Sequence, residues 1–224
     1  MNIKHNVNYF RKSDMFKGLG LGMAIVGFLL LWFGWSYITY LISVVFIPVG
    51  VIMFIVSSSG RSSDSDIDND VKRKTEGLEK DLGEDKKYSR KILKHIPPET
   101  VGGYEYEEGL MLTKAKNGSV RSSEYTKAVI YILSDCLYIP RRTVSLVSED
   151  VRDTLFEIPY EMIKGVEITR EDKMLTFGKR TFNVKKTRLV ISYGDGLTFS
   201  APIHDDVNAD ALVDKITRIS KGEI

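Results

Sequence analysis

The densest group of residues that could bind a ligand lies between Asp172 and Asp195. Six basic residues fall there with no acidic residue among them: Lys173, Lys179, Arg180, Lys185, Lys186 and Arg188. Clustered Lys and Arg side chains attract anionic lipid, at about 1 kcal/mol for each residue near a membrane surface. The cluster therefore predicts a surface for anionic lipid or an acidic protein partner, with Phe177 and Phe182 interleaved. The alternative is a solvated face balanced by neighbouring acidic residues, namely Glu161, Glu167, Glu171 and Asp172.

Patterns for catalysis or metal binding are absent from the sequence. The three histidines, His5, His95 and His204, are far apart, and no Cys–His spacing matches a zinc site. There is no glycine-rich phosphate loop and no Gly-x-Ser-x-Gly turn for a nucleophilic serine. We therefore expect a non-enzymatic protein without a metal or cofactor.

The acidic run at residues 64–70 resembles a calcium-binding loop but fails its two main demands. Its sixth position is Asn69 instead of Gly, and its twelfth is Thr75 instead of Glu. A solvated acidic linker explains the run better. Apolar residues are sparse after it, which predicts a frayed helix over residues 66–95.

Short runs of β-branched and aromatic residues alternate with turn residues after residue 101. This pattern predicts antiparallel strands over residues 107–114, 125–133, 136–140, 143–147, 154–158, 163–169, 174–177, 181–184, 187–193 and 197–201. Lys179 and Arg180 then lie at the tip of one hairpin, and Lys185, Lys186 and Arg188 lie near the next turn. Cys136 falls within a predicted strand, so we expect it in the core.

The last segment, residues 205–220, has the apolar spacing of an amphipathic helix, with Asp205 or Asp206 as its N-cap. Many antiparallel strands followed by one such helix are typical of a small barrel or sandwich that the helix closes at one end. The fold class predicted for the chain is therefore α+β. Arg141 and Arg142, in the strand region, are a second and weaker basic candidate.

The N-terminal quarter of the chain has the composition of membrane-spanning helices. Residues 18–56 hold no Asp, Glu, Lys, Arg or His over 39 positions. A bilayer core about 30 Å thick accepts about 20 helical residues, so this stretch suits two spans. Trp32, Trp35 and Tyr37 mark the turn between them, because Trp and Tyr favour the membrane–water interface. The alternatives are a buried helical hairpin of a soluble protein and a cleaved signal peptide.

The charges beside this hairpin predict its orientation. Basic residues precede it at Lys4, Arg11, Lys12 and Lys17, and others follow from Arg61 onward, whereas the turn carries no charge. Positive residues stay on the cytoplasmic side. We therefore expect a cell-membrane protein whose termini and soluble domain are cytoplasmic, and a single cysteine suits that reducing compartment.

Small residues in the first span could bring helices close together. Gly18 and Gly22 have the small-xxx-small spacing, and Gly27 lies further along the same helix. These three glycines could pack the hairpin on itself or join two copies in a homo-oligomer. No ionisable group lies within either span, which argues against an ion or proton pathway.

The predicted regions are a basic arm (1–17), a two-helix transmembrane hairpin (18–56), a polar, partly helical linker (57–100) and a β domain with a C-terminal helix (101–224). The β domain holds eighteen basic and nineteen acidic residues, a net charge of −1. Domains that bind nucleic acid usually carry a basic face or a high pI. We therefore expect no nucleic-acid partner.

Four segments of the β domain carry a resemblance to a known family: residues 131–139 (YILSDCLYI), 156–166 (FEIPYEMIKGV), 189–196 (LVISYGDG) with Phe199, and 210–216 (DALVDKI). They resemble the strands, hairpins and closing helix of GRAM and bacterial pleckstrin-homology-like (PH-like) domains. The resemblance covers residues 105–220 and implies a PH-like β-barrel or sandwich capped by a C-terminal helix. Its motifs are structural, so it implies a fold more than an activity. Lys114, Lys116 and Arg121 do not reproduce the family's phosphoinositide pattern.

Together these features predict a membrane-anchored, non-enzymatic binding or scaffold module. Its PH-like domain would engage a protein partner or anionic lipid at the cytoplasmic face. The alternative is a structural subunit of a membrane complex that assembles through the transmembrane hairpin. A small-ligand carrier or an enzyme would need a pocket, which a sequence does not reveal.

Overall fold

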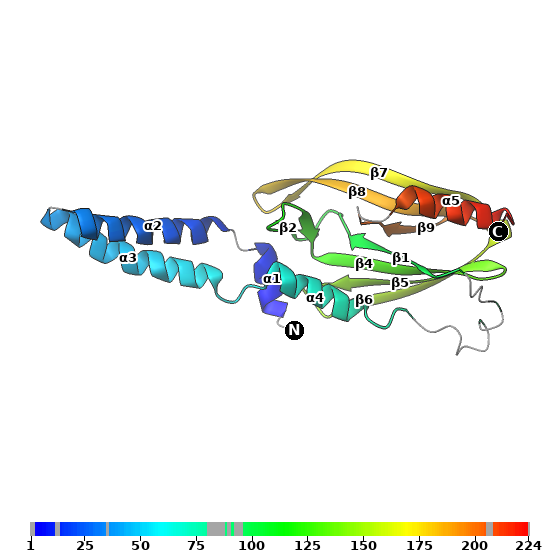
Figure 1. The fold of residues 1–224 in the computed structure, drawn as a ribbon, viewed down its shortest axis with the longest axis horizontal. Coiled ribbons are helices and arrows are strands. Elements are labelled where there is room, and N and C mark those ends of the chain that lie inside the picture. The colour runs from blue at the N-terminus through cyan, green and yellow to red at the C-terminus, as the bar shows by residue number, and fades with distance from the viewer. Residues whose placement is uncertain are drawn as a thin grey trace. The chain divides into compact units, whose positions relative to one another are not determined.

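The computed structural model of the chain describes residues 3–11, 14–34, 36–79, 88, 91, 96–204 and 208–223. Its contacts divide the chain into two compact units, Asn2–Ser63 and Asp64–Ile224. We call them the helical unit and the β unit. Both are drawn in Figure 1 and each is described by itself.

The helical unit consists of α1 (Ile3–Arg11), α2 (Asp14–Phe33) and α3 (Tyr37–Ser58). Within α2 and α3, Phe16–Phe33 and Tyr37–Ser57 are long and apolar enough to cross a membrane. Large side chains such as Phe28, Ile52 and Ile55 are exposed on these helices. The predicted pair of apolar helices is confirmed, and their insertion into a membrane stays a prediction.

Glycines let α2 and α3 touch along their backbones. A Cβ atom added at Gly50 would lie 2.6 Å from the amide nitrogen of Ala24, and one added at Gly20 would lie 2.8 Å from the carbonyl oxygen of Gly50. Real Cβ atoms do not come so close, so both positions need glycine for this helix pair to form. Ser36 caps the N-terminus of α3, because its Oγ accepts a hydrogen bond from the Ile38 amide at 3.3 Å.

The N-terminal helix is hydrogen-bonded to the segment that leaves α3. Ser62 Oγ donates to Asn6 Oδ1 at 2.5 Å, and Asn8 Nδ2 donates to the Gly60 carbonyl oxygen at 2.8 Å. The Ser62 amide also donates to the His5 carbonyl oxygen at 3.2 Å. The basic arm predicted over residues 1–17 is therefore a helix over most of its length. The residues before α2 and after α3 lie together at one end of the hairpin.

In its described residues the β unit contains two larger antiparallel sheets, a short hairpin, two α-helices and the short 3-10 helix η1 (Tyr160–Met162). The four-stranded sheet has the order β1-β4-β5-β6 and the three-stranded sheet the order β7-β8-β9, while β2 pairs with β3. Their bounds are β1 (Glu99–Tyr104), β2 (Leu112–Lys114), β3 (Val120–Ser122), β4 (Glu124–Ile132), β5 (Cys136–Ser145), β6 (Val151–Pro159), β7 (Ile163–Phe177), β8 (Arg180–Tyr193) and β9 (Leu197–Pro202). The predicted α+β class, with antiparallel sheets before a C-terminal helix, is confirmed.

The main core fills the space between these sheets and α5 (Ala209–Ser220). Its fully buried side chains come from both sheets and from α5, and include Ile130, Ile139, Leu189, Ile191, Phe199 and Ile216. Asn208 caps α5, because its Oδ1 accepts from the Ala211 amide at 3.2 Å. The helix thus starts later than predicted and has a different cap, while Asp205 and Asp206 lie outside the described residues.

Strands are longer than predicted at three places. The predicted pairs 136–140 with 143–147, 163–169 with 174–177, and 181–184 with 187–193 are the single strands β5, β7 and β8. Charged residues interrupt the apolar pattern at each break, but the backbone ladder continues, and some of the charged side chains pair across it. At the first break, for example, Arg142 Nε donates to Asp153 Oδ1 at 2.7 Å across β5 and β6. The strand predicted over 107–114 is limited to β2, and β1 and β3 were not predicted.

The region predicted as a linker over 57–100 is in part a packed piece of the β unit. Helix α4 (Asp64–Thr75) buries Ile67 completely. Arg121 Nη2 donates to Asp68 Oδ2 at 3.0 Å, and Lys74 Nζ donates to the carbonyl oxygen of Ser145 at 2.6 Å. The helix expected over 66–95 therefore ends at Thr75, and most of residues 80–95 lie outside the described part. The compact unit begins at Asp64, well before residue 101.

Candidate functional site

The basic residues of the 172–195 stretch all lie on the long β7–β8 hairpin or at its turn. Pairing between the strands places Asp172 opposite Lys185 and Glu171 opposite Lys186. A stretch without acidic residues in the sequence therefore meets acidic residues across the ladder. The turn predicted beside Lys185, Lys186 and Arg188 does not form, because β8 is continuous from Arg180 to Tyr193.

Two of the six basic residues are held in ion pairs. Lys186 Nζ lies 2.5 Å from Glu107 Oε1, and Arg188 Nη1 lies 2.5 Å from Glu105 Oε2. The hydrogen bond from Lys186 holds the pKa of the Glu107 carboxyl below its ordinary value. These two pairs fasten the chain after β1 to β8, so they serve the fold.

The other four basic residues divide between two places. Side chains alternate between the faces of a strand, and the register puts Lys173 and Arg180 on one face and Lys185 on the other. Lys179 follows Gly178, whose φ of +61° shapes the turn. We call Lys173, Lys179 and Arg180 the tip cluster. Met174, 76% exposed, follows Lys173 in β7 but points to the opposite face of the hairpin, the face of Asn183 and Lys185.

The aromatic residues expected among these cations have a different role. Phe182 is buried with Leu112, Leu175 and Val184 in a small core between the hairpin and β2, and Phe177 packs at its margin. The two ends of the β7–β8 hairpin thus bury opposite faces, one in the main core and one against β2–β3. Phe177 lies opposite Arg180 in the ladder, so one of the two predicted aromatic residues is next to the tip cluster.

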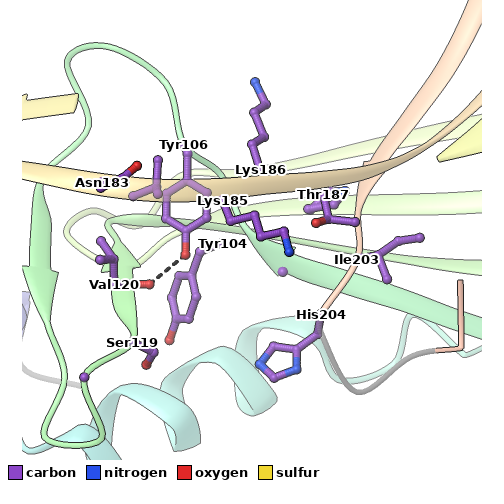
Figure 2. A pocket seen from close by; sticks show the side chains of 14 residues that line it. Tyr104, Tyr106, Ser119, Val120, Asn183, Lys185, Lys186, Thr187, Ile203 and His204 are labelled. Atoms are coloured by element: carbon purple, nitrogen blue, oxygen red, sulfur yellow. Dashed lines mark hydrogen bonds between the residues drawn. The ribbon is translucent and has the colours of Figure 1, made fainter. Parts of the chain in front are cut away.

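A cavity of about 300 Å³ opens beside β8 (Figure 2). Residues 183–187 of β8 form one wall, and the others come from the end of β1, the β2–β3 turn and residues 202–204 after β9. Two lysines, Lys185 and Lys186, and His204 line it, and none of its lining residues in the described part of the chain is Asp or Glu. The cavity is therefore a basic concave surface on the β unit.

Two tyrosines give the cavity its aromatic side. Tyr106 donates from its hydroxyl to the Val120 carbonyl oxygen at 2.6 Å, as Figure 2 shows. Burial raises the pKa of Tyr104 well above its ordinary value, against a smaller opposing effect of the Arg121 guanidinium. Tyr104 is thus a neutral hydroxyl that can donate a hydrogen bond at any physiological pH.

The weaker candidates from the sequence are structural. Arg142 is paired with Asp153. Arg141 Nη1 donates to the Ser200 carbonyl oxygen at 3.1 Å, and its guanidinium lies 5.0 Å from the ring centre of Phe156. Cys136 is buried as predicted, and burial raises the pKa of its thiol to about 11.

The histidines do not come together in the described part of the chain. His5 lies in α1, His204 lines the cavity, and His95 is outside the described residues. No group of His, Cys, Asp and Glu among the described residues is arranged to hold a metal ion.

Gly27 contacts α3, whereas Gly18 and Gly22 do not. A Cβ atom at Gly27 would lie 2.8 Å from Ile47 Cγ1, but one at Gly18 or Gly22 would meet nothing within 4 Å. The contact between α2 and α3 uses Gly20 and Gly50, which the sequence analysis missed. Gly20 and Ala24 have the same small-xxx-small spacing as Gly18 and Gly22, so this spacing could have identified Gly20.

Comparison with protein-family models gave no match, and comparisons with curated proteins and with solved structures gave none either. The resemblance of residues 105–220 to PH-like domains therefore stays a prediction.

Proposed function

We propose that this chain is a membrane-anchored, non-enzymatic binding module. The α2–α3 hairpin is its anchor, and the β unit is a PH-like domain that engages anionic lipid at the cytoplasmic face of the cell membrane. The observation that carries the proposal is the pair of apolar helices with exposed large side chains. Soluble proteins rarely expose apolar patches of more than a few hundred Å², so a lipid environment suits this surface best.

The order of strands supports the PH-like part of the proposal. Four antiparallel strands, then three, then a closing helix follow one another in the chain, with β2–β3 inserted between β1 and β4. Antiparallel strands followed by one closing helix are what the resemblance implies.

The tip cluster supports the choice of anionic lipid. Lys179 and Arg180 lie at the end of a hairpin, where their cations can reach a headgroup layer. Three cations at about 1 kcal/mol each give weak binding. Only residues 59–63 join α3 to α4, so the anchor would raise the local concentration of the β unit at the bilayer.

The proposal is tested with the full chain in liposomes. A Thr176→Cys variant, made in a Cys136→Ser background, carries an environment-sensitive fluorophore beside the tip. We expect its emission to rise and shift to the blue in liposomes with 30% anionic lipid, and to revert in high salt because the attraction is screened.

Reversing the tip charges should abolish that response. Lys179→Glu with Arg180→Glu is the test variant, and Lys164→Glu with Lys221→Glu, at the other end of β7 and beyond α5, is the control with the same change of net charge. If the tip variant responds like the control, or if neutral and anionic liposomes give the same emission, lipid is not the partner and an acidic protein takes its place.

A second candidate function is a structural subunit that assembles through the hairpin. The observation in its favour is that Gly18 and Gly22 face away from α3, where another helix could pack closely. Gly18→Leu with Gly22→Leu should then remove crosslinked oligomers in membranes. Unchanged oligomers in this variant would count against assembly at this face.

A further inference from the structure

We infer that the cavity beside β8 binds a small hydroxylated anion, a phosphate ester or a hydroxy acid. This goes beyond the proposed function, because Lys185 points to the opposite face of the hairpin from Lys173 and Arg180. The tip cluster would meet a membrane surface. The cavity would enclose one small molecule.

One edge of β8 is open beside the cavity. β8 pairs with β7 along its whole length but with β9 only as far as Arg188, opposite Pro202. One more hydrogen bond follows, from the Ile203 amide to the Thr187 carbonyl oxygen at 3.0 Å. Beyond it, β8 continues with no neighbouring strand on this side among residues that the structure describes.

The open edge leaves backbone groups for a ligand. In an antiparallel ladder every second residue turns its N–H and C=O to the same side. Since Thr187 turns its carbonyl toward residue 203, Lys185 and Asn183 turn theirs into the space beyond the end of β9. Both residues line the cavity. Within the described residues no backbone partner meets these groups, so a ligand could accept from two N–H groups and donate to two carbonyls.

Lys185 brings a positive charge to the cavity. The Lys185 side chain is exposed and extends along the cavity toward the segment of Ile203 and His204 (Figure 2). Lys186 is held by Glu107, so Lys185 is the lysine available to a ligand. Among the described residues, no carboxylate lines the cavity itself, although Asp172 lies opposite Lys185 in the ladder. An ammonium beside backbone N–H groups favours an oxyanion.

The size and the lining of the cavity suit a small hydroxylated molecule. About 300 Å³ is at the lower end of the range for ligand pockets, which suits a molecule smaller than a typical drug. Tyr104 and Tyr106 supply aromatic surface, and Tyr104 a neutral hydroxyl. The open carbonyls of Asn183 and Lys185 require donors, which the hydroxyl groups of the ligand would provide.

The test uses the full chain in detergent micelles with glycerol 2-phosphate and citrate as separate probes, followed by calorimetry. We expect saturable binding of at least one probe. Lys185→Gln should weaken it about tenfold, because a charge-assisted hydrogen bond is lost. Lys179→Gln is the matched control: it removes the same charge from the same hairpin outside the cavity, and should change the affinity less than twofold.

Hydrogen exchange gives a second readout that does not depend on a variant. The amides of Asn183 and Lys185 should exchange quickly in the free protein and at least fivefold more slowly with the probe. The inference is overturned if neither probe saturates by 50 mM, if Lys179→Gln and Lys185→Gln weaken binding equally, or if exchange at residues 183–185 is unchanged by a bound probe.

The same chemistry could come from a free metabolite or from a lipid headgroup, and a liposome arm separates these sources. If phosphatidylglycerol supplies the anion, Lys185→Gln will reduce the response of the tip fluorophore and glycerol 2-phosphate will compete with it. If the ligand is free, the probe will bind without changing that response. The tip variant Lys179→Glu with Arg180→Glu should lose the liposome response yet still bind the probe, so failure of the lipid proposal and failure of this inference are distinguishable.

Discussion

Charged side chains close together in the β7–β8 sequence differ sharply in what they contact. Lys185 lines a cavity, Lys186 and Arg188 are held by Glu107 and Glu105, and Lys179 lies at the turn. The sequence alone shows that no acidic residue lies among the six basic residues. Their partners could not be predicted, because Glu105 and Glu107 lie about 80 residues earlier in the chain. Only the folding of the segment after β1 against β8 brings them together.

The ion pair of Arg188 and Glu105 should be the most sensitive charged contact of the hairpin. Its side chains are only 17% and 12% exposed. Arg188→Met leaves the carboxylate without its partner, so we expect a loss of roughly 3 kcal/mol in the free energy of unfolding. Adding Glu105→Gln should restore part of that loss. Chemical unfolding of the full chain in detergent measures both.

The exposed pair of Lys164 and Asp195 is the control for this experiment. Their side chains are 61% and 108% exposed, so Lys164→Met should cost less than about 1 kcal/mol. Equal losses for Arg188→Met and Lys164→Met would show that burial does not govern these pairs.

Among the elements, those with a strong local pattern were the predictable ones. The apolar helices, the glycine turns and the amphipathic α5 follow from composition and spacing. Helix α4 was missed as a packed element because only Ile67 and Thr75 are buried in it, so its sequence has no apolar stripe. Charges attach it instead, through Asp68 to Arg121 and through Lys74 to backbone carbonyls. Strand β1 was missed because Gly102 and Gly103 weaken its pattern.

Helix α4 should contribute measurably to the stability of the β unit. Ile67 is completely buried, so Ile67→Ala should cost about 2–5 kcal/mol. Val71→Ala, a smaller change at a partly buried position of the same helix, should cost less. Thermal unfolding of the two variants, followed by circular dichroism, makes the comparison. Equal midpoints would mean that α4 is not docked in solution.

For the whole molecule, the hydrogen bonds between α1 and residues 60–62 bear on topology. They hold the two flanks of the hairpin together, so both flanks must lie on the same side of any membrane that α2 and α3 cross. The sequence supports the same arrangement independently, through basic residues on both flanks. The hydrogen bonds do not indicate which side of the membrane this is. The basic residues do, because positive residues stay on the cytoplasmic side.

Cysteine labelling tests the side. In a Cys136→Ser background, Tyr37→Cys at the start of α3 should react with an impermeant thiol reagent added to intact cells, and Ser63→Cys should not. Ser63→Cys should react once the membrane is opened. The reverse pattern would place the β unit outside the cell and would remove the inner leaflet as its target.

The bonds that join α1 to the end of the hairpin also set an order of events during synthesis. Asn6 and Asn8 bind residues that the ribosome adds 56 and 52 positions later. The first helix therefore emerges without its partner and must wait until both apolar helices have been made. Insertion of α2 alone cannot complete the helical unit. The hairpin becomes a finished piece only when its last turn arrives, just before translation of the β unit begins.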